Sequence, residues 1–494
     1  MLGLFAEKSD HPLADSKEAK RLFAELAGKD AAEALDEATI LIDSLQRDRR
    51  IGPDKRWDIL RQMDDAMIAH ARRFARDYAA AASSTRSAEM RRWRLGAEYW
   101  RHLADAYLDV LAITPPRPRD GMKAALPAFH ARTLHALAAV LKWGQFRYAP
   151  PARECWLELG RAYMAAVTAG STETTLALYA GDRVTTPERE YLKALAFHAS
   201  SMDSLLPQEI ELADRVLDFL LPQFQFGAQM RPDSVYWVDA MSGQAPARLA
   251  VRPQAAASLR CFSPGLAIDE IATLKAQVEQ QTLPSGLVLG SSYPPEMLMA
   301  VLDHLAGYWA PVPPQRSHAR LRVKSRMAVV QSLAMSYRCL ATAVDGDLES
   351  WWVEDVSQGG MRATAPLVRD SKLAVNTLLL MRPEGGDNWL LGVVRRLSRG
   401  DDANAGLGIE TLSKQPRALC VDSGGIQTEV ILVDDWQTAA QVRVVLPATA
   451  WEDNIAMTFD DGGTAVKLFP DGQEQCGPDY LIGRYRVRVA ESDA

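Results

Sequence analysis

The sequence predicts a multi-domain α+β protein in which an N-terminal α-helical array precedes a C-terminal β-barrel region. Its 494 residues amount to about three typical domains. Apolar residues recur at helical spacing up to about residue 225, and short strands separated by turns prevail from about residue 316. We therefore expect a helical domain over 1–230, a mixed α/β linking domain over 231–314, a β-barrel over 315–415, and a β-rich extension or second barrel over 416–494.

The helical part starts with Lys17–Gln46, where apolar residues follow one another at steps of three and four. Gly52-Pro53 breaks the pattern before Trp57 resumes it, and Pro187 stands where helices commonly begin. Further helices are predicted at Leu95–Ile113, Ala128–Lys142, Arg153–Ala169, Pro187–Leu205 and Pro207–Leu221. We expect these helices to form an antiparallel array, either solenoid-like or an irregular bundle.

The pattern changes near residue 232. The linking region contains two predicted strands and two predicted helices: Ser234–Val238, Arg248–Val251, Ile268–Gln280 and Pro295–Gly307. Strands then follow at Met327–Gln331, Trp351–Glu354, Val375–Met381, Trp389–Val394, Leu407–Glu410, Thr428–Val433, Gln441–Leu446, Thr464–Leu468 and Tyr485–Val489. Many short strands separated by glycine-rich turns predict a small β-barrel, and the length is sufficient for two.

Composition excludes several classes of protein. With 48% hydrophobic and 24% charged residues, the chain is neither fibrous nor mostly disordered. A net charge of −7 argues against a nucleic-acid polymer as partner. The five cysteines are scattered without C-x-x-C spacing, which predicts reduced thiols in the cytoplasm. No uninterrupted run of about 18 apolar residues occurs, so we expect no membrane span.

Motifs of common enzymes and metal sites are missing from the sequence. It contains no Walker A loop, no G-x-G-x-x-G after a strand, no H-E-x-x-H and no G-x-S-x-G. His130 and His135 are five residues apart and do not share a helical face. We therefore expect no metal and no enzymatic activity. An enzyme with an unrecognised catalytic site is kept as a hypothesis beside the two binding functions given below.

A dense cationic stretch follows the proline-rich segment that ends at Pro314. It contains two R-x-x-x-R frames, Arg316 with Arg320 and Arg322 with Arg326. Guanidinium groups suit phosphates and flat bases. Taken alone, two arginines four residues apart are more typical of a solvated surface.

A second motif, Asp355-x-Ser357-x-x-Gly360, follows the predicted strand Trp351–Glu354. Taken alone it is typical of a β-turn, because Asp and Ser bond back to the backbone and glycine adopts positive φ.

Together, the arginine frames, the intervening strand, the D-x-S-x-x-G motif and the later strands resemble the PilZ domain over about residues 315–415. That family consists of small β-barrels that act as receptors for the bacterial second messenger cyclic di-GMP. The resemblance implies that Arg316 and Arg320 wrap the dinucleotide, with Arg322 and Arg326 as the alternative frame. It further implies the following roles: Asp355 accepts hydrogen bonds from a guanine edge, Ser357 bonds phosphate or base, and Gly360 lets the turn approach the ligand.

Two features depart from the family pattern. Arg320 lies 35 residues before Asp355, which is longer than usual, and Gln315 stands where a further arginine is common. The first hypothesis is thus a cytoplasmic cyclic di-GMP effector whose helical domain contacts an unidentified protein partner governing motility, biofilm or envelope output. The alternative is an interaction scaffold whose degenerate barrel no longer binds nucleotide.

Overall fold

The chain divides into two units at residue 314, one spanning 1–314 and the other 315–494. The computed structural model describes residues 9–81, 86–115, 119–287, 289, 293–312, 319–342, 348–366, 373–399 and 403–489.

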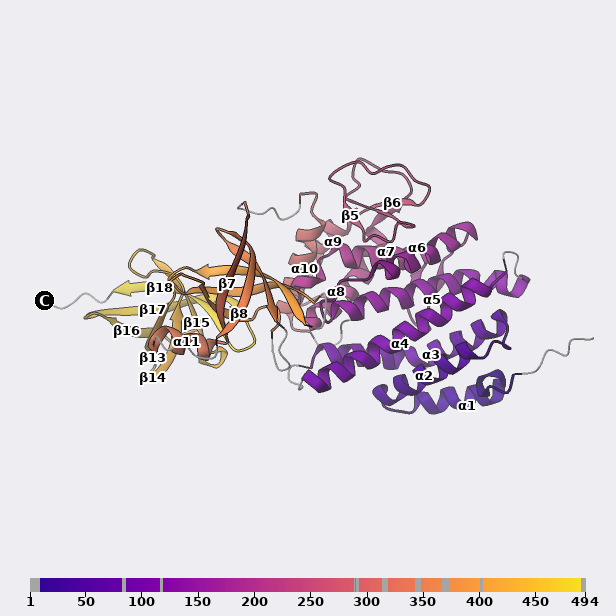
Figure 1. Ribbon diagram of the computed structural model, residues 1–494, viewed down its shortest axis with the longest axis horizontal. Coiled ribbons are helices and arrows are strands. Elements are labelled where there is room, and N and C mark those ends of the chain that lie inside the picture. Colours follow the sequence, from indigo (N-terminus) through magenta and orange to yellow (C-terminus); the bar gives the residue numbers. More distant parts are fainter. Residues whose placement is uncertain are drawn as a thin grey trace, which may run out of the picture. The chain divides into compact units, whose positions relative to one another are not determined.

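Helices dominate the first unit (Figure 1). They are α1 (Ser16–Ala27), α2 (Ala31–Arg47), α3 (Pro53–Ala79), α4 (Arg86–Ile113), α5 (Asp120–Gln145), α6 (Arg153–Thr168), α7 (Pro187–Ala199), α8 (Pro207–Leu220), α9 (Ala267–Glu279) and α10 (Pro295–Trp309). From α1 to α8 neighbours in sequence pack against one another, as do α9 with α10, α2 with α4 and α5 with α7. The predicted helical array is therefore confirmed.

The residues that cap the helices explain where several of them begin. Lys17–Gln46 forms two helices rather than one, because the Asp30 carboxylate accepts hydrogen bonds from the backbone N–H groups of Ala32 and Glu33 and so starts α2. Pro53, read from the sequence as a break in the pattern, occupies the first turn of α3. The hydroxyl of Thr186 accepts the backbone N–H of Arg189 and caps α7.

A buried polar cluster joins α3, α4 and α5. Asp64 is fully buried and accepts hydrogen bonds from Tyr107 Oη at 2.8 Å, Tyr179 Oη at 3.0 Å and Arg132 Nη1 at 2.9 Å. Arg132, itself 5% exposed, also contacts Asp65. A buried charge is tolerated where hydrogen bonds and an opposite charge surround it, as they do here.

Within the described residues, α5 is the one helix long and apolar enough to cross a membrane. In the structure it packs against α4, α6 and α7, and 56% of its apolar window is buried inside the molecule. Core helices of soluble proteins have the same composition, so this feature assigns no membrane span.

Two small sheets complete the first unit. One is a hairpin of β1 (Leu176–Ala177) and β2 (Val184–Thr185). The other has the order β3-β6-β4-β5 and consists of β3 (Gln225–Gly227), β4 (Tyr236–Asp239), β5 (Ala247–Arg248) and β6 (Leu259–Ser263). The sequence did not indicate β3 or β6.

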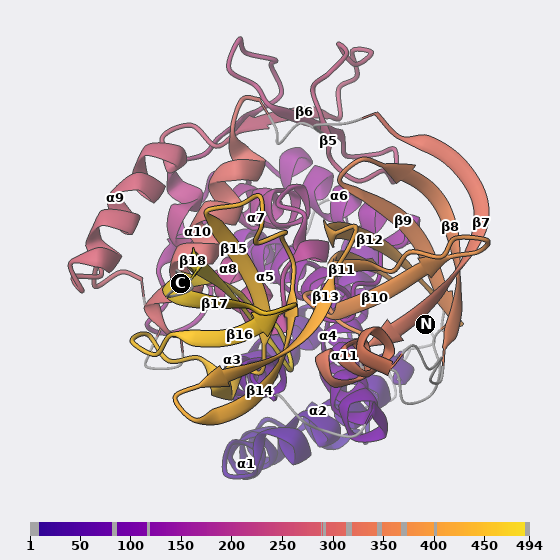
Figure 2. The same ribbon diagram turned by 90° about the vertical axis from the view of Figure 1, so that its left-hand side faces the viewer.

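The second unit contains two closed antiparallel barrels, as Figure 2 shows. The first has the order β10-β11-β12-β9-β8-β7 and is built from β7 (Leu321–Gln331), β8 (Glu349–Ser357), β9 (Gly360–Pro366), β10 (Leu378–Pro383), β11 (Leu390–Ser398) and β12 (Asn404–Ser413). The second has the order β13-β14-β15-β18-β17-β16 and is built from β13 (Arg417–Ser423), β14 (Ile426–Leu432), β15 (Gln441–Leu446), β16 (Met457–Asp461), β17 (Thr464–Cys476) and β18 (Leu481–Val489). The predicted fold class is thus confirmed.

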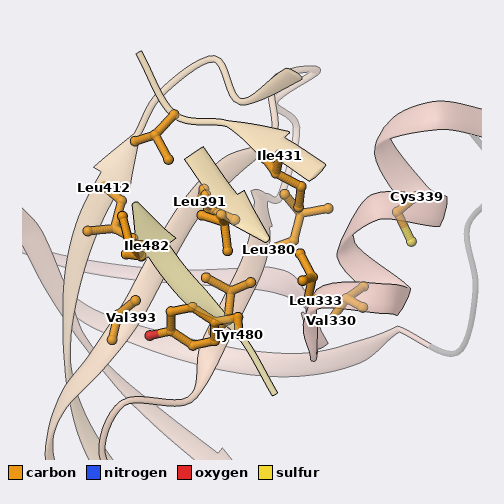
Figure 3. Packing of buried hydrophobic residues seen from close by; sticks show 13 residues of the cluster. Val330, Leu333, Cys339, Leu380, Leu391, Val393, Leu412, Ile431, Tyr480 and Ile482 are labelled. Carbon is orange, nitrogen blue, oxygen red and sulfur yellow. The ribbon is translucent and has the colours of Figure 1, made fainter. Parts of the chain in front are cut away.

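A hydrophobic cluster connects the two barrels (Figure 3). The first barrel contributes Leu380, Leu391 and Val393, and the second contributes Ile431 and Ile482, all fully buried. Because successive strand residues point to opposite faces, these side chains cover the outside of each barrel while their neighbours fill its interior.

A helix that the sequence reading missed, α11 (Leu333–Thr342), lies between β7 and β8 in sequence. It packs on β7 and β10 of the first barrel and on β13 and β14 of the second. Leu333 and Cys339 of this helix join the shared cluster. The helix therefore contributes to the core between the barrels.

Candidate functional site

Strands β7, β8 and β9 of the first barrel position most of the sequence-predicted site residues. The strands pair antiparallel, with Arg322 opposite Asp355 and Asp355 opposite Arg362. Arg320 precedes β7 by one residue. The chain thus enters the barrel beside the end of β8, where the D-x-S-x-x-G motif lies.

Arg320 and Asp355 form an ion pair in the structure. Arg320 Nη1 donates to Asp355 Oδ1 at 2.8 Å, and the two side chains are 29% and 20% exposed. The long interval between them does not separate them, because α11 loops out and β7 and β8 still pair on either side of it.

Ser357 and Gly360 close the hairpin between β8 and β9. They are register partners, and the Ser357 hydroxyl donates to the Gly360 carbonyl oxygen at 3.0 Å. A Cβ on Gly360 would come within 2.2 Å of the carbonyl oxygen of Ile409 on β12. Within the chain, both residues therefore shape the turn that follows Asp355, and glycine at 360 is required by the close approach of a neighbouring strand.

The alternative arginine frame is divided between two places on the barrel. Arg322 is exposed, lies opposite Asp355, and makes no ion pair with any described residue. Arg326 lies farther along β7, where its guanidinium carbon stands 4.5 Å from the ring centre of Trp352. Arg316 of the preferred frame lies outside the described residues.

Arg362 is a neighbour of Asp355 that sequence reasoning missed. It is exposed on β9 and its Nε is 3.0 Å from a carboxylate oxygen of Glu354. The signal available in the sequence was its position two residues after Gly360, on a strand whose side chains point alternately to opposite faces. Arg320, just before β7, Arg322 on β7 and Arg362 on β9 thus lie around Asp355.

This arrangement suits recognition of a guanine nucleotide. A carboxylate accepts from the N–H groups of a guanine edge, and guanidinium groups bind phosphate oxygens or guanine O6 and N7. Among the described residues, no cluster of three or more His, Cys, Asp or Glu side chains could hold a metal ion. The residues gathered here offer hydrogen bonds and charge to a ligand.

The comparison with protein families concerns the helical unit. No curated protein matches the chain. Residues 17–232, which run from α1 past α8 and stop before β4, match the family model of the cyclic-di-GMP receptor FimW, N-terminal domain.

Proposed function

We propose that this protein is a cytoplasmic cyclic di-GMP effector whose first C-terminal barrel binds the nucleotide in the manner of a PilZ domain. The observation that carries the proposal is the ion pair of Arg320 with Asp355, which brings the two motifs together on adjacent strands. The similarity of residues 17–232 to the N-terminal domain of a cyclic di-GMP receptor supports the same ligand by an independent route.

The roles of individual residues follow from this proposal. Arg320 exchanges Asp355 for a phosphate, which frees the carboxylate to accept hydrogen bonds from a guanine edge. Arg322 and Arg362 supply further positive charge beside the ligand. The helical unit relays binding to a protein partner in motility, biofilm or envelope regulation, and the protein is a receptor rather than an enzyme.

A calorimetric titration tests nucleotide binding and its specificity. Wild type should bind cyclic di-GMP with micromolar affinity and cyclic di-AMP much more weakly, because adenine lacks the N1–H that a carboxylate accepts. Asp355→Ala should reduce this discrimination, whereas Arg338→Ala, an exposed arginine of α11, should leave it unchanged. Equal affinity for both dinucleotides in wild type would contradict the proposed role of Asp355.

A second experiment tests the relay. Partners that copurify with wild type should change in amount when cyclic di-GMP is added, and should not respond in Arg320→Ala.

The scaffold alternative rests on one feature of the structure. Asp355 and Ser357 already have partners within the chain, in Arg320 and Gly360. A scaffold would retain its protein partner without nucleotide, and titration with cyclic di-GMP would produce no heat.

A further inference from the structure

A cavity of about 600 Å³ lies in the helical unit between α3, α5, α7 and α8, beside the β1–β2 hairpin. This volume falls in the range of small-molecule sites. Part of its wall is apolar and includes Ile68, Ala75 and Ala139, whereas the wall formed by α7 and α8 is strongly charged.

Lysines of α5 and α7 form a ladder of ion pairs with carboxylates of α8 along the charged wall. Lys142 Nζ lies 3.0 Å from Glu211 and 2.9 Å from Asp214, and Lys193 Nζ lies 3.4 Å from Asp214 and 3.1 Å from Asp218. Burial lowers the pKa of Lys193, but Asp214 and Asp218 raise it by more, so this ammonium group stays charged. The lysines of the ladder are thus neutralised by their own carboxylates.

Two other cations on the cavity lining, Arg76 and Arg189, differ from these lysines. Arg72 pairs with Asp182, but Arg76 and Arg189 make no ion pair and no side-chain hydrogen bond with the rest of the described chain. Among the described residues that line the cavity, seven lysines and arginines face five carboxylates. The excess positive charge favours an anion.

We propose that this cavity is a second ligand site, which binds an organic phosphate of nucleotide size. Arg76 and Arg189 hold its phosphate groups, because guanidinium groups match phosphate oxygens in pairs. The apolar wall accommodates the uncharged part of the ligand, because a cavity of this volume has room for a molecule larger than phosphate alone. The site lies in a different unit from the barrel and does not depend on the function proposed for the barrel.

The test uses the full chain carrying Arg320→Ala and Asp355→Ala, so that binding at the barrel is removed. Pyrophosphate, guanosine 5′-triphosphate and cyclic di-GMP are titrated separately by calorimetry. At least one of the nucleotides should bind saturably and more tightly than pyrophosphate. No saturable binding of either nucleotide up to about 1 mM, or binding of pyrophosphate alone, would overturn the proposal.

Variants then locate the site. Arg76→Gln with Arg189→Gln should weaken binding by about tenfold or more. The matched pair Arg73→Gln with Arg161→Gln changes exposed arginines of α3 and α6 that do not line the cavity, and it should bind as the parent does. Equal affinities in the two pairs would place the ligand elsewhere.

A charge-preserving pair guards against a folding defect. If the glutamine variant loses its helical circular dichroism, Arg76→Lys with Arg189→Lys replaces it. Lysine keeps the charge but cannot make the paired contacts of a guanidinium, so affinity should still fall measurably. Wild-type affinity in a folded lysine variant would refute the assignment of the two arginines.

Discussion

Removing Arg320 should weaken cyclic di-GMP binding by about 5- to 30-fold. The pair that Arg320 forms with Asp355 is partly exposed, at 29% and 20%, and such pairs contribute about 0.2–1 kcal/mol. A charge-assisted hydrogen bond to phosphate contributes about 1.5–3 kcal/mol. Binding exchanges the first interaction for the second, so Arg320→Ala forfeits a net of about 1–2 kcal/mol, which corresponds to the stated change in Kd.

The assay is calorimetric titration at constant ionic strength of wild type, Arg320→Ala, Asp355→Ala and the double variant. The loss of binding free energy in the double variant should exceed the sum of the two single losses by about the energy of the ion pair, because each single change already spares binding the cost of breaking that pair. Arg338→Ala provides the control, since this exposed arginine lies in α11, outside the proposed site.

Two results would refute parts of this reasoning. If Arg320→Ala binds within about twofold of wild type while Asp355→Ala is impaired, Arg320 is not the arginine that holds the phosphate, and Arg322 takes that role. If neither variant changes the affinity, the ligand does not bind at the ends of β7 and β8.

Two further predictions concern the stability of the helical unit, measured as the free energy of unfolding from hydrogen exchange of amides in α3 and α5. Asp64→Ala should lower it by about 3–5 kcal/mol, because Arg132 loses its buried carboxylate partner and keeps only Asp65, whose side chain is 39% exposed. The exposed Asp58→Ala should change it little, and equal effects would show that burial of the pair is unimportant. Burial lowers the pKa of His130 from 6.5 to about 4, so the folded state binds fewer protons than the unfolded state between these values. The contribution of His130 to the free energy of unfolding is therefore complete above about pH 6.5 and is lost as pH falls to 4, a loss of about 3 kcal/mol. His130→Gln should remove that part of the pH dependence. Identical profiles of stability against pH for both proteins would contradict this expectation.

Periodicity and turns in the sequence were sufficient for the order of helices and barrels, but not for α11. This helix starts after Ser332, whose φ is +82°, and the backbone N–H of Leu333 donates to the Asp479 carboxylate at 2.7 Å. The Asp479 carboxylate comes from 146 residues away and leaves no local signal, whereas the Ser332 hydroxyl, which accepts the backbone N–H of Met335 at 3.4 Å, is a local cap that sequence reasoning missed. Between α1 and α2 the helical spacing of apolar residues over Lys17–Gln46 did not specify a boundary, which the local cap at Asp30 sets.

The two candidate sites differ in how far sequence could lead to them. Arg320 and Asp355 belong to short motifs, so their residue types could be recognised, but only the strand register places them in contact. The cavity of the helical unit has no motif at all, because Arg76 and Arg189 lie on different helices more than a hundred residues apart. Its charges are brought together by packing of α3, α5, α7 and α8, which periodicity does not specify.

The cluster that joins the barrels decides where the chain can be cut. A fragment ending near residue 415 would lack Ile431 and Ile482 and would expose the side chains of Leu380, Leu391 and Val393 to water. At about 25 cal/mol per Å² of apolar surface, such a fragment would lose solubility as well as stability. The smallest fragment that keeps this cluster covered is therefore the pair of barrels, and a fluorescent reporter fused to it belongs after β18 rather than after β12.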